Sequence, residues 1–398
     1  MGRRALALCL SLGACGDDGS DTEGTGSGSS GAPVTTGAPT TGADTGTADT
    51  GATGGPGSTG DATGGATDDT GSDTDSDTGS DTNSDTSTGE PLGPTGHFLA
   101  VGDGGRRVRS PDGVVWDGQV GSGLLDTDDE MAAPDALRAL AVGDGYIVAV
   151  GGGGNFYTGN AMVMRSTDGG VTWQEDLLKD KPDFSPHKLY GAAASGQVVV
   201  AAGMRGKAIR SEDGGLGWTD ISFEDQSSRL LGVAAQGDTF VVVGWTDNGE
   251  FPNTSVLISS PDLGLTWGAV DHSFENLETI AAGNGAFVAI GASKCLRSQD
   301  GVAWVECGPL SLDFKAVSFT GGEFVLASAE GLATSQDGMA WTTPTLPPVG
   351  PPAQLARGNG RYVGVRWTDR GWSEDLEGWS FATWATEPLR TIVFVPAP

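Results

Sequence analysis

The stretch Ser166-Thr-Asp168-Gly-Gly-Val-Thr-Trp173 decides the fold, because it is one of seven similar copies that follow residue 97. Each copy has a Ser, an Asp two residues later, and a Trp four or five residues after that Asp. Successive copies of the Asp are 56, 45, 49, 38, 37 and 38 positions apart. A period of about 40 to 50 residues with short strands in each unit is typical of a β-propeller. We name the seven acidic residues the box aspartates: Asp112, Asp168, Asp213, Asp262, Asp300, Asp337 and Asp375.

Each residue type of the repeat has a local structural reason. A short Asp side chain can accept hydrogen bonds from backbone N–H groups of its own turn. Gly allows the positive φ that such a turn needs, and Trp can bury a large ring between sheets while its N–H finds a partner. We therefore expect the box aspartates to be structural rather than catalytic.

Apolar runs upstream of each box supply the other strands of a blade. In the second unit they are 137–142, 146–150 and 161–164, which we call strands A, B and C, and the box Trp opens strand D. The runs are continuous rather than alternating, as expected for strands covered on both faces. Strand A is rich in Ala, which fits strands that converge on a propeller axis.

The two ends of the repeat region complement each other. The first unit has strand B at His97 but no strand A, whereas residues 389–395 (LRTIVFV) resemble residues 137–142 (LRALAV). We therefore expect the C-terminal strand to complete the first blade, which leaves no open sheet edge. The prediction is an all-β domain over 96–398, a seven-bladed propeller of four-stranded antiparallel blades.

The boxes at Asp168 and Asp262 match the full pattern S-x-D-x-G-x-T-W. This motif resembles the Asp-box, or BNR, repeat of sialidase-like, sortilin-type and photosystem assembly-factor propellers, and the resemblance spans about 300 residues. It implies the fold but no activity, since such boxes occur in enzymes and in non-enzymes. A sialidase would also need three clustered Arg, a Tyr/Glu pair and an early Phe-Arg-Ile-Pro motif, and that motif is absent.

The N-terminus has the features of an export signal. Residues 1–14 combine two Arg with a short apolar run, and an apolar stretch of this length is too short to span a bilayer. The ending Leu12-Gly-Ala-Cys15 resembles the bacterial lipobox, which implies that Cys15 is lipidated and anchors the chain to the cell envelope. We expect the outer membrane or cell surface; an ordinary signal peptide with a chance Cys is the alternative.

Residues 15–95 are predicted to be a disordered acidic linker rich in Gly, Thr, Ser and Asp. Within 16–95 there are 13 Asp and 2 Glu but no Lys, Arg or aromatic residue, so nothing could form a core. The whole chain has 22 Lys and Arg against 52 Asp and Glu, a net charge of −30. This balance argues against nucleic acid, and against any membrane contact apart from the lipid anchor.

Two cysteines remain in the repeat region. Cys295 and Cys307 lie six residues either side of Gly301, in strands C and D of one blade, so opposed positions would bring them to disulfide distance. An exported protein favours a disulfide over free thiols. No His is near them in the sequence, and we expect no metal or cofactor.

A candidate binding face follows from the strand order. Loops between strands B and C, and between strand D and the next strand A, should gather on the face opposite the boxes, where propeller loops form sites. They carry aromatic, amide and charged residues that suit sugars or peptides, although these residues could simply pack the loops. The candidates are Asn155, Phe156, Tyr157, Asn160, Trp245, Asp247, Asn248, Phe251, Trp367, Asp369, Arg370 and Trp372.

These features favour a monomeric, non-catalytic recognition or scaffold module that binds a glycan or protein at the cell envelope. The first alternative is a glycan-active hydrolase of sialidase-like or xyloglucanase-like type. It would need two carboxyl groups about 5–10 Å apart, for which Asp247 and Asp369 are a conceivable pair. The second alternative is an assembly factor for an envelope complex, although the sequence does not reveal the basic central patch of the photosystem propellers.

Overall fold

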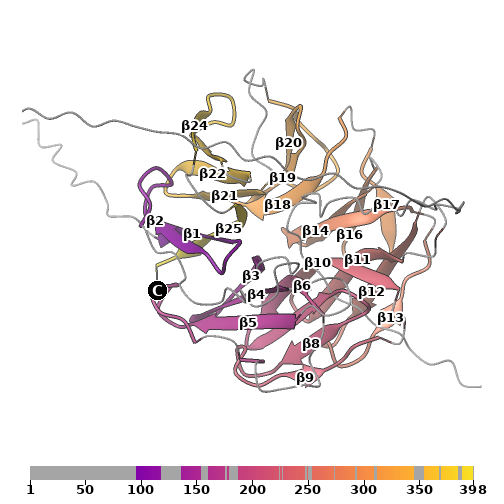
Figure 1. The fold of residues 1–398 in the computed structure, drawn as a ribbon. Coiled ribbons are helices and arrows are strands. Elements are labelled where there is room, and N and C mark those ends of the chain that lie inside the picture. Colours follow the sequence, from indigo (N-terminus) through magenta and orange to yellow (C-terminus); the bar gives the residue numbers. More distant parts are fainter. Residues whose placement is uncertain are drawn as a thin grey trace, which may run out of the picture. The chain divides into compact units, whose positions relative to one another are not determined.

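The structure is a computed structural model. It describes residues 96–117, 136–153, 160–174, 177–178, 187–223, 225, 227–246, 249, 253–272, 274–291, 294–308, 312–344, 354–366, 369–383 and 388–397. These residues form seven antiparallel sheets around a common axis and contain no helix (Figure 1). The predicted signal peptide, lipidated Cys15 and acidic linker lie outside the described residues.

The blades follow the chain, and the strands of each blade are named in order from the axis outward. Blade 1 is β25 (Leu389–Pro396), β1 (Gly96–Gly102) and β2 (Arg107–Ser110); blade 2 is β3 (Ala136–Gly143), β4 (Tyr146–Gly153) and β5 (Asn160–Ser166); blade 3 is β6 (Leu189–Ser195), β7 (Val198–Gly203), β8 (Ala208–Ser211) and β9 (Thr219–Asp220). Blade 4 is β10 (Ser228–Gln236), β11 (Thr239–Thr246), β12 (Thr254–Ser260) and β13 (Gly268–Ala269); blade 5 is β14 (Leu277–Gly283), β15 (Ala286–Gly291), β16 (Lys294–Ser298) and β17 (Trp304–Glu306). Blade 6 is β18 (Ala316–Thr320), β19 (Glu323–Ala327) and β20 (Leu332–Ser335); blade 7 is β21 (Gln354–Gly358), β22 (Arg361–Arg366), β23 (Asp369–Ser373) and β24 (Ser380–Thr383).

The seven-bladed architecture and its closure by the C-terminal strand are confirmed. β25 pairs antiparallel with β1 over the register Gly96↔Pro396 to Val101↔Thr391. Blade 1 is therefore built from both ends of the repeat region, and the innermost strand of every blade is strand A.

The outermost strand is much reduced in three blades. In blades 2 and 6 it is represented by the single bridges Arg165↔Gln174 and Thr334↔Thr342. In blade 1 the described residues show only one backbone hydrogen bond at this position, from Asp117 N to Arg109 O of β2 (2.9 Å). The outer edge of a blade contributes least to the core, so it tolerates this shortening.

The core is divided among the junctions between blades. Each of the seven junctions holds its own cluster of buried apolar side chains, including the junction between blades 7 and 1. In four blades the second or third residue of strand B is a Phe that is almost completely buried: Phe98, Phe240, Phe287 and Phe324. The uninterrupted apolar runs are thus explained, because both faces of these strands pack against a neighbouring blade.

Candidate functional site

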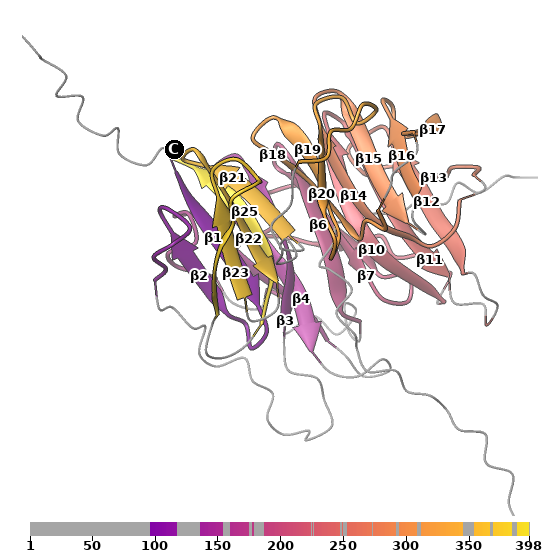
Figure 2. The same ribbon diagram turned by 90° about the horizontal axis from the view of Figure 1, so that it is seen from above.

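The connections between strands fall on two faces of the ring. Asn284, in the turn between β14 and β15, donates from Nδ2 to Gly322 O (2.7 Å) and Gln336 O (3.0 Å). Gly322 lies in the equivalent turn of blade 6 and Gln336 lies in its box turn, so these connections share one face, which we name the box face. The remaining connections lie at the other ends of the strands, on what we name the loop face (Figure 2).

Each box turn satisfies its own polar groups. In the second box, Ser166 Oγ donates to Asp168 Oδ1 (2.8 Å) and accepts from Gly170 N (2.8 Å). Asp168 also accepts from a backbone N–H and from a Thr hydroxyl of the same turn, and Trp173 Nε1 donates to Gly170 O (3.0 Å). The Ser–Asp contact recurs in the other six boxes. The Trp contact recurs in all but one, since Trp341 Nε1 has no partner among the described residues.

These contacts keep the box carboxylates ionised. Burial alone would raise the pKa of Asp168, but hydrogen bonds from Thr172 and Ser166 outweigh it and lower the pKa to about 2. Backbone hydrogen bonds are the main cause of the lowered pKa at Asp300, Asp337 and Asp375. The pKa of each remaining box aspartate is lowered as well. A carboxylate held as an anion by its own turn is unsuited to act as a general acid at neutral pH.

The box turns also join neighbouring blades. At five of the seven junctions a side chain of one blade contacts a backbone carbonyl oxygen in the box of the next blade. The contacts are His97 Nε2 to Gly169 O (2.6 Å), Arg165 Nε to Gly214 O (2.7 Å), Arg210 Nε to Leu263 O (2.7 Å), Arg297 Nε to Asp337 O (2.7 Å) and Arg361 Nη1 to Asp112 O (2.9 Å). We therefore assign the box face a structural role.

Five of the twelve candidate binding residues are described, and they lie in three different blades. Asn160 is exposed in blade 2, Trp245 is half-buried in blade 4, and Asp369 and Arg370 begin β23 in blade 7. Trp372, one residue before the box Ser of blade 7, packs against the core between blades 7 and 1 instead of lying in a loop. The other candidates lie outside the described residues: Asn155, Phe156, Tyr157, Asp247, Asn248, Phe251 and Trp367.

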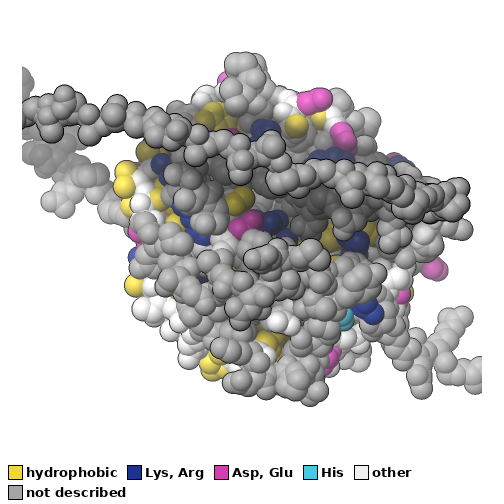
Figure 3. Space-filling model, viewed as in Figure 1, with side chains coloured by type: hydrophobic (Ala, Val, Ile, Leu, Met, Phe, Trp, Pro, Cys, Tyr) yellow, Lys and Arg dark blue, Asp and Glu magenta, His cyan; other side chains and the backbone are white. Residues whose placement is uncertain are grey.

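The loop face instead carries an arc of basic side chains over blades 1 to 4. Four of its members are only 5% or 6% exposed, namely Arg106, Arg138, Lys188 and Lys207, and the other three are half-buried. Figure 3 shows Lys and Arg side chains around the recessed centre of this face. We name the basic arc by its seven residues: Arg106, Arg138, Lys188, Arg205, Lys207, Arg229 and Arg390.

Contacts link Arg390 and Arg138 of the arc to their neighbours across blades 1 to 3. Arg390 forms a two-point ion pair with Asp103, in which Nη2 lies 3.1 Å from Oδ2. Asp103 bridges to Ala136, two residues before Arg138. The guanidinium of Arg138 in turn lies 5.2 Å from the ring centroid of Tyr190 in blade 3.

The arc continues from blade 3 into blade 4. Lys188 O accepts from Met204 N (3.0 Å), and Met204 bridges to Arg229. The guanidinium of Arg229 lies 4.8 Å from the ring centroid of Trp245. Trp245, a predicted site residue, therefore marks the end of the arc, and the cation–π contact holds both side chains in place.

The sequence contains a signal for this arc, although the repeat alone does not reveal it. Residues 137–138 and 389–390 are both Leu-Arg pairs at the start of an inner strand. In both strands a β-bulge leaves the Arg as the unpaired extra residue, Arg138 in β3 and Arg390 in β25. A bulge turns a side chain away from its regular position, so a charged residue there need not enter the core.

Of the carboxyl pair considered for hydrolysis, the structure describes only Asp369. Asp369 accepts from Thr383 Oγ1 (3.0 Å), and its conceivable partner Asp247 lies outside the described residues. Tyr362 donates to Glu323 but is 4% exposed. Its pKa is raised, by burial first and then by Glu323, so the phenol is a poor nucleophile.

Cys295 and Cys307 are joined by a disulfide with their Cα atoms 5.3 Å apart, at the loop-face end of the hairpin that carries the fifth box.

No group of three or more His, Cys, Asp or Glu among the described residues could hold a metal ion. Within the same residues there is no helix long and apolar enough to cross a membrane.

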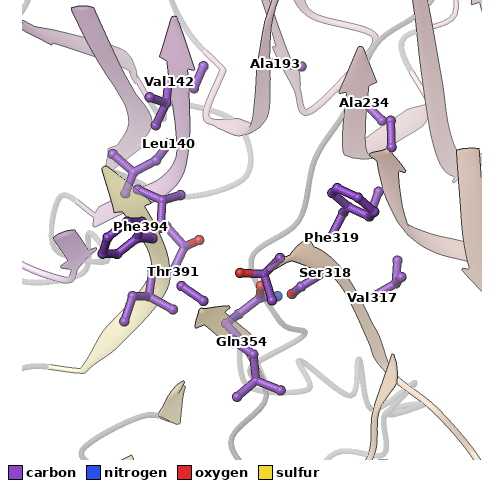
Figure 4. Close-up of a pocket in the computed structure, with 18 of the residues that line it drawn as sticks. Leu140, Val142, Ala193, Ala234, Val317, Ser318, Phe319, Gln354, Thr391 and Phe394 are labelled. Carbon is purple, nitrogen blue, oxygen red and sulfur yellow. The ribbon is translucent and has the colours of Figure 1, made fainter. Parts of the chain in front are cut away.

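A cavity of about 520 Å³ lies on the axis of the ring. All seven inner strands line it, and Figure 4 shows side chains from several of them pointing into the same space. Gln354, Ser318 and Thr391 are among the lining residues and come from the consecutive strands β21, β18 and β25.

No protein-family model and no curated protein matches this chain. Among solved structures it is similar to the GH74 xyloglucanase from Xanthomonas campestris, with 18% identity, a TM-score of 0.52, and coverage of 76% of this chain and 53% of that one. It is also similar to YCF48 bound to a D1 peptide (18% identity, TM-score 0.46, 62% and 81% covered). A third similar structure is YCF48 from Cyanidioschyzon merolae (16% identity, TM-score 0.46, 62% and 84% covered). At these identities the xyloglucanase similarity shows the propeller fold alone.

Proposed function

We propose that the chain is a non-catalytic recognition protein of the bacterial cell envelope, and that its loop face binds an anionic ligand. The observation that carries this proposal is the basic arc, which concentrates seven Lys and Arg on one side of a chain whose net charge is −30. A local concentration of positive charge in a recessed surface attracts anions even when the whole molecule is acidic. The ligand class is an acidic glycan or an acidic protein segment.

The geometry of the arc supports binding rather than chemistry. The ion pairs Arg390–Asp103 and Lys207–Asp220 (2.5 Å) fix parts of it in place. Half-buried guanidinium groups such as Arg205 and Arg229 can offer planar pairs of N–H donors to carboxylates or sulfates. Trp245, held against Arg229, adds an aromatic surface that suits a sugar ring or a peptide side chain.

The experiment measures binding of the full chain to two polyanions, polygalacturonate and poly-glutamate. We expect binding to at least one of them at low ionic strength, weakening as salt screens the exposed charges. The double variant R205Q/R229Q should bind at least tenfold more weakly. K294Q, which removes an exposed charge in blade 5 outside the arc, should bind normally.

Three outcomes would contradict the proposal. They are binding to neither polyanion, binding that does not depend on the arc, and turnover of fluorogenic sialidase or glucanase substrates above background. Neutral poly-glutamine serves as the matched polymer control for charge.

The envelope location is a separate part of the proposal and rests on Leu12-Gly-Ala-Cys15. Lipidation of Cys15 would hold the propeller near a bacterial membrane by its acyl chains. Metabolic labelling with a palmitate analogue should mark the wild-type chain and not C15A. Equal labelling of C15A would refute the lipid anchor without touching the binding proposal.

A further inference from the structure

The cavity on the propeller axis has the size of a small-molecule site. Its volume of about 520 Å³ lies in the range of about 300–1,000 Å³ typical of ligand pockets. The basic arc is not part of its lining. It is therefore a second candidate site, independent of the anionic ligand proposed above.

The cavity has two chemically different walls. Blades 2 to 5 line it with aliphatic residues only, three from each inner strand: 140–142, 192–194, 233–235 and 280–282. Blades 6, 7 and 1 add Ser318, Thr320, Gln354, Arg357 and Thr391. All seven inner strands occupy the same place in their blades, so this division does not follow from the repeat.

Gln354 is a buried polar residue whose side-chain N–H groups the described fold does not satisfy. It is 7% exposed, and its Nε2 has no hydrogen-bond partner among the described residues. Register with the strand B partners places Ala139, Gly191, Gly232 and Ala316 at the corresponding position of four other blades, and Thr279 and Thr391 at that of the remaining two. A long amide thus replaces a small residue at this level, and burying an amide without a partner is unfavourable.

Two hydroxyl groups lie on the same side of the cavity. Thr391 in β25 and Ser318 in β18 flank β21, the strand of Gln354 (Figure 4). Among the described lining residues Arg357 alone is charged, and it pairs with Glu323 (Nη1–Oε1 3.6 Å) and stacks on Tyr362 (4.7 Å). The polar wall thus offers uncharged donors and acceptors at its centre.

We propose that the axial cavity binds a small neutral molecule that carries an amide group on an apolar body. The Gln354 side-chain oxygen accepts from the N–H of the ligand amide, because Nε2 has almost no exposed surface. The aliphatic wall of blades 2 to 5 takes the apolar body. The ligand is uncharged because the one charged lining residue is already paired.

Saturation-transfer NMR with N-acetyl-leucine amide and N-acetyl-phenylalanine amide tests this proposal on the full chain. We expect at least one of these probes to bind the wild type and to bind Q354L at least tenfold more weakly. Q299L makes the same change at an exposed position of the fifth box and should bind like the wild type. Absence of binding by both probes, or binding that Q354L leaves unchanged, would overturn the proposal.

Thermal unfolding supplies a second readout without any ligand. If Gln354 is kept for a ligand, Q354L should melt at a higher temperature than the wild type, because Leu removes a buried amide that lacks a partner. An unchanged or lower melting temperature in Q354L would count against the proposal. Binding of Q354L to the polyanions should stay normal, so failure of the cavity proposal is distinguishable from failure of the loop-face proposal.

Discussion

The box face and the loop face of this ring are built on opposite principles. On the box face the same turn occurs seven times, and its Ser, Asp and backbone groups satisfy one another. On the loop face different residues lie at or beside the first residues of the inner strands, among them Arg138, Lys188 and Arg390. The difference teaches that repetition marks the residues needed in every blade, whereas departures from the repeat mark the candidates for function.

Blade 5 shows the contrast within one hairpin. At the box face, β16 and β17 are joined by a turn that Asp300 closes with hydrogen bonds to the N–H groups of Val302 and Ala303. At the loop face, the same two strands are held by the disulfide between Cys295 and Cys307. A feature shared by all blades secures one end, and a feature peculiar to this blade secures the other.

The largest effect is expected from removing β25, the strand that closes the ring. Deletion of 389–398 takes away the inner strand of blade 1 and exposes the clusters on either side of it. We expect loss of the cooperative thermal transition, measured by circular dichroism. A truncated chain that melts like the full one would disprove closure of the ring.

A pair of Trp variants compares the two faces directly. Trp267 in the fourth box is 7% exposed and its Nε1 donates to Gly264 O (2.7 Å), so W267A should lower the free energy of unfolding by about 3–5 kcal/mol. W245A removes a half-buried ring on the loop face and should cost less than about 1 kcal/mol. Urea unfolding measures both, and equal losses would refute the division of roles between the faces.

Loss of the disulfide should have an intermediate effect. The bond closes a loop with a sequence separation of 12 residues, for which the chain-entropy model gives about 3 kcal/mol. The double variant C295A/C307A should lose roughly that much free energy of unfolding. It should bind the polyanions normally, because blade 5 lies outside the basic arc. A double variant as stable as the wild type would show that the disulfide does not stabilise this blade.

The smallest effect concerns acid stability and belongs to the box face. The pKa of Asp168 is lowered to about 2 in the folded chain, against about 3.9 for an unfolded Asp. Its contribution is therefore complete above about pH 4 and is lost as the pH falls towards 2. Melting temperatures between pH 5 and pH 2 should fall less steeply for D168N than for the wild type. Identical slopes would show that Asp168 does not contribute.

Much of the fold could be predicted from the sequence, for physical reasons. The turn at Asp168 is fixed by contacts within eight residues, so a short sequence pattern is enough to predict it. Ring closure was also predictable, because residues 389–395 resemble an inner strand and the first unit of the repeat lacks one.

The candidate site was far less predictable. The basic arc combines Arg390 with Arg138, which are 252 positions apart in the sequence; Arg390 pairs with Asp103, and Asp103 bridges to Ala136, two residues before Arg138. Trp372 was expected in a loop but packs in the core, because β23 runs as far as the neighbouring box Ser. Gln354 looked like an ordinary strand residue, and its burial beside a cavity depends on all seven inner strands.

Hydrogen–deuterium exchange of the full chain, with and without the polyanion that binds it, tests the division between the faces most directly. We predict that the bound ligand slows exchange in loop-face segments that carry the arc, namely 103–106, 188–190, 204–207 and 228–230. Exchange in the box turns, such as 166–172 and 298–303, should stay unchanged. Protection of the box turns with no change in the arc segments would contradict the division of roles.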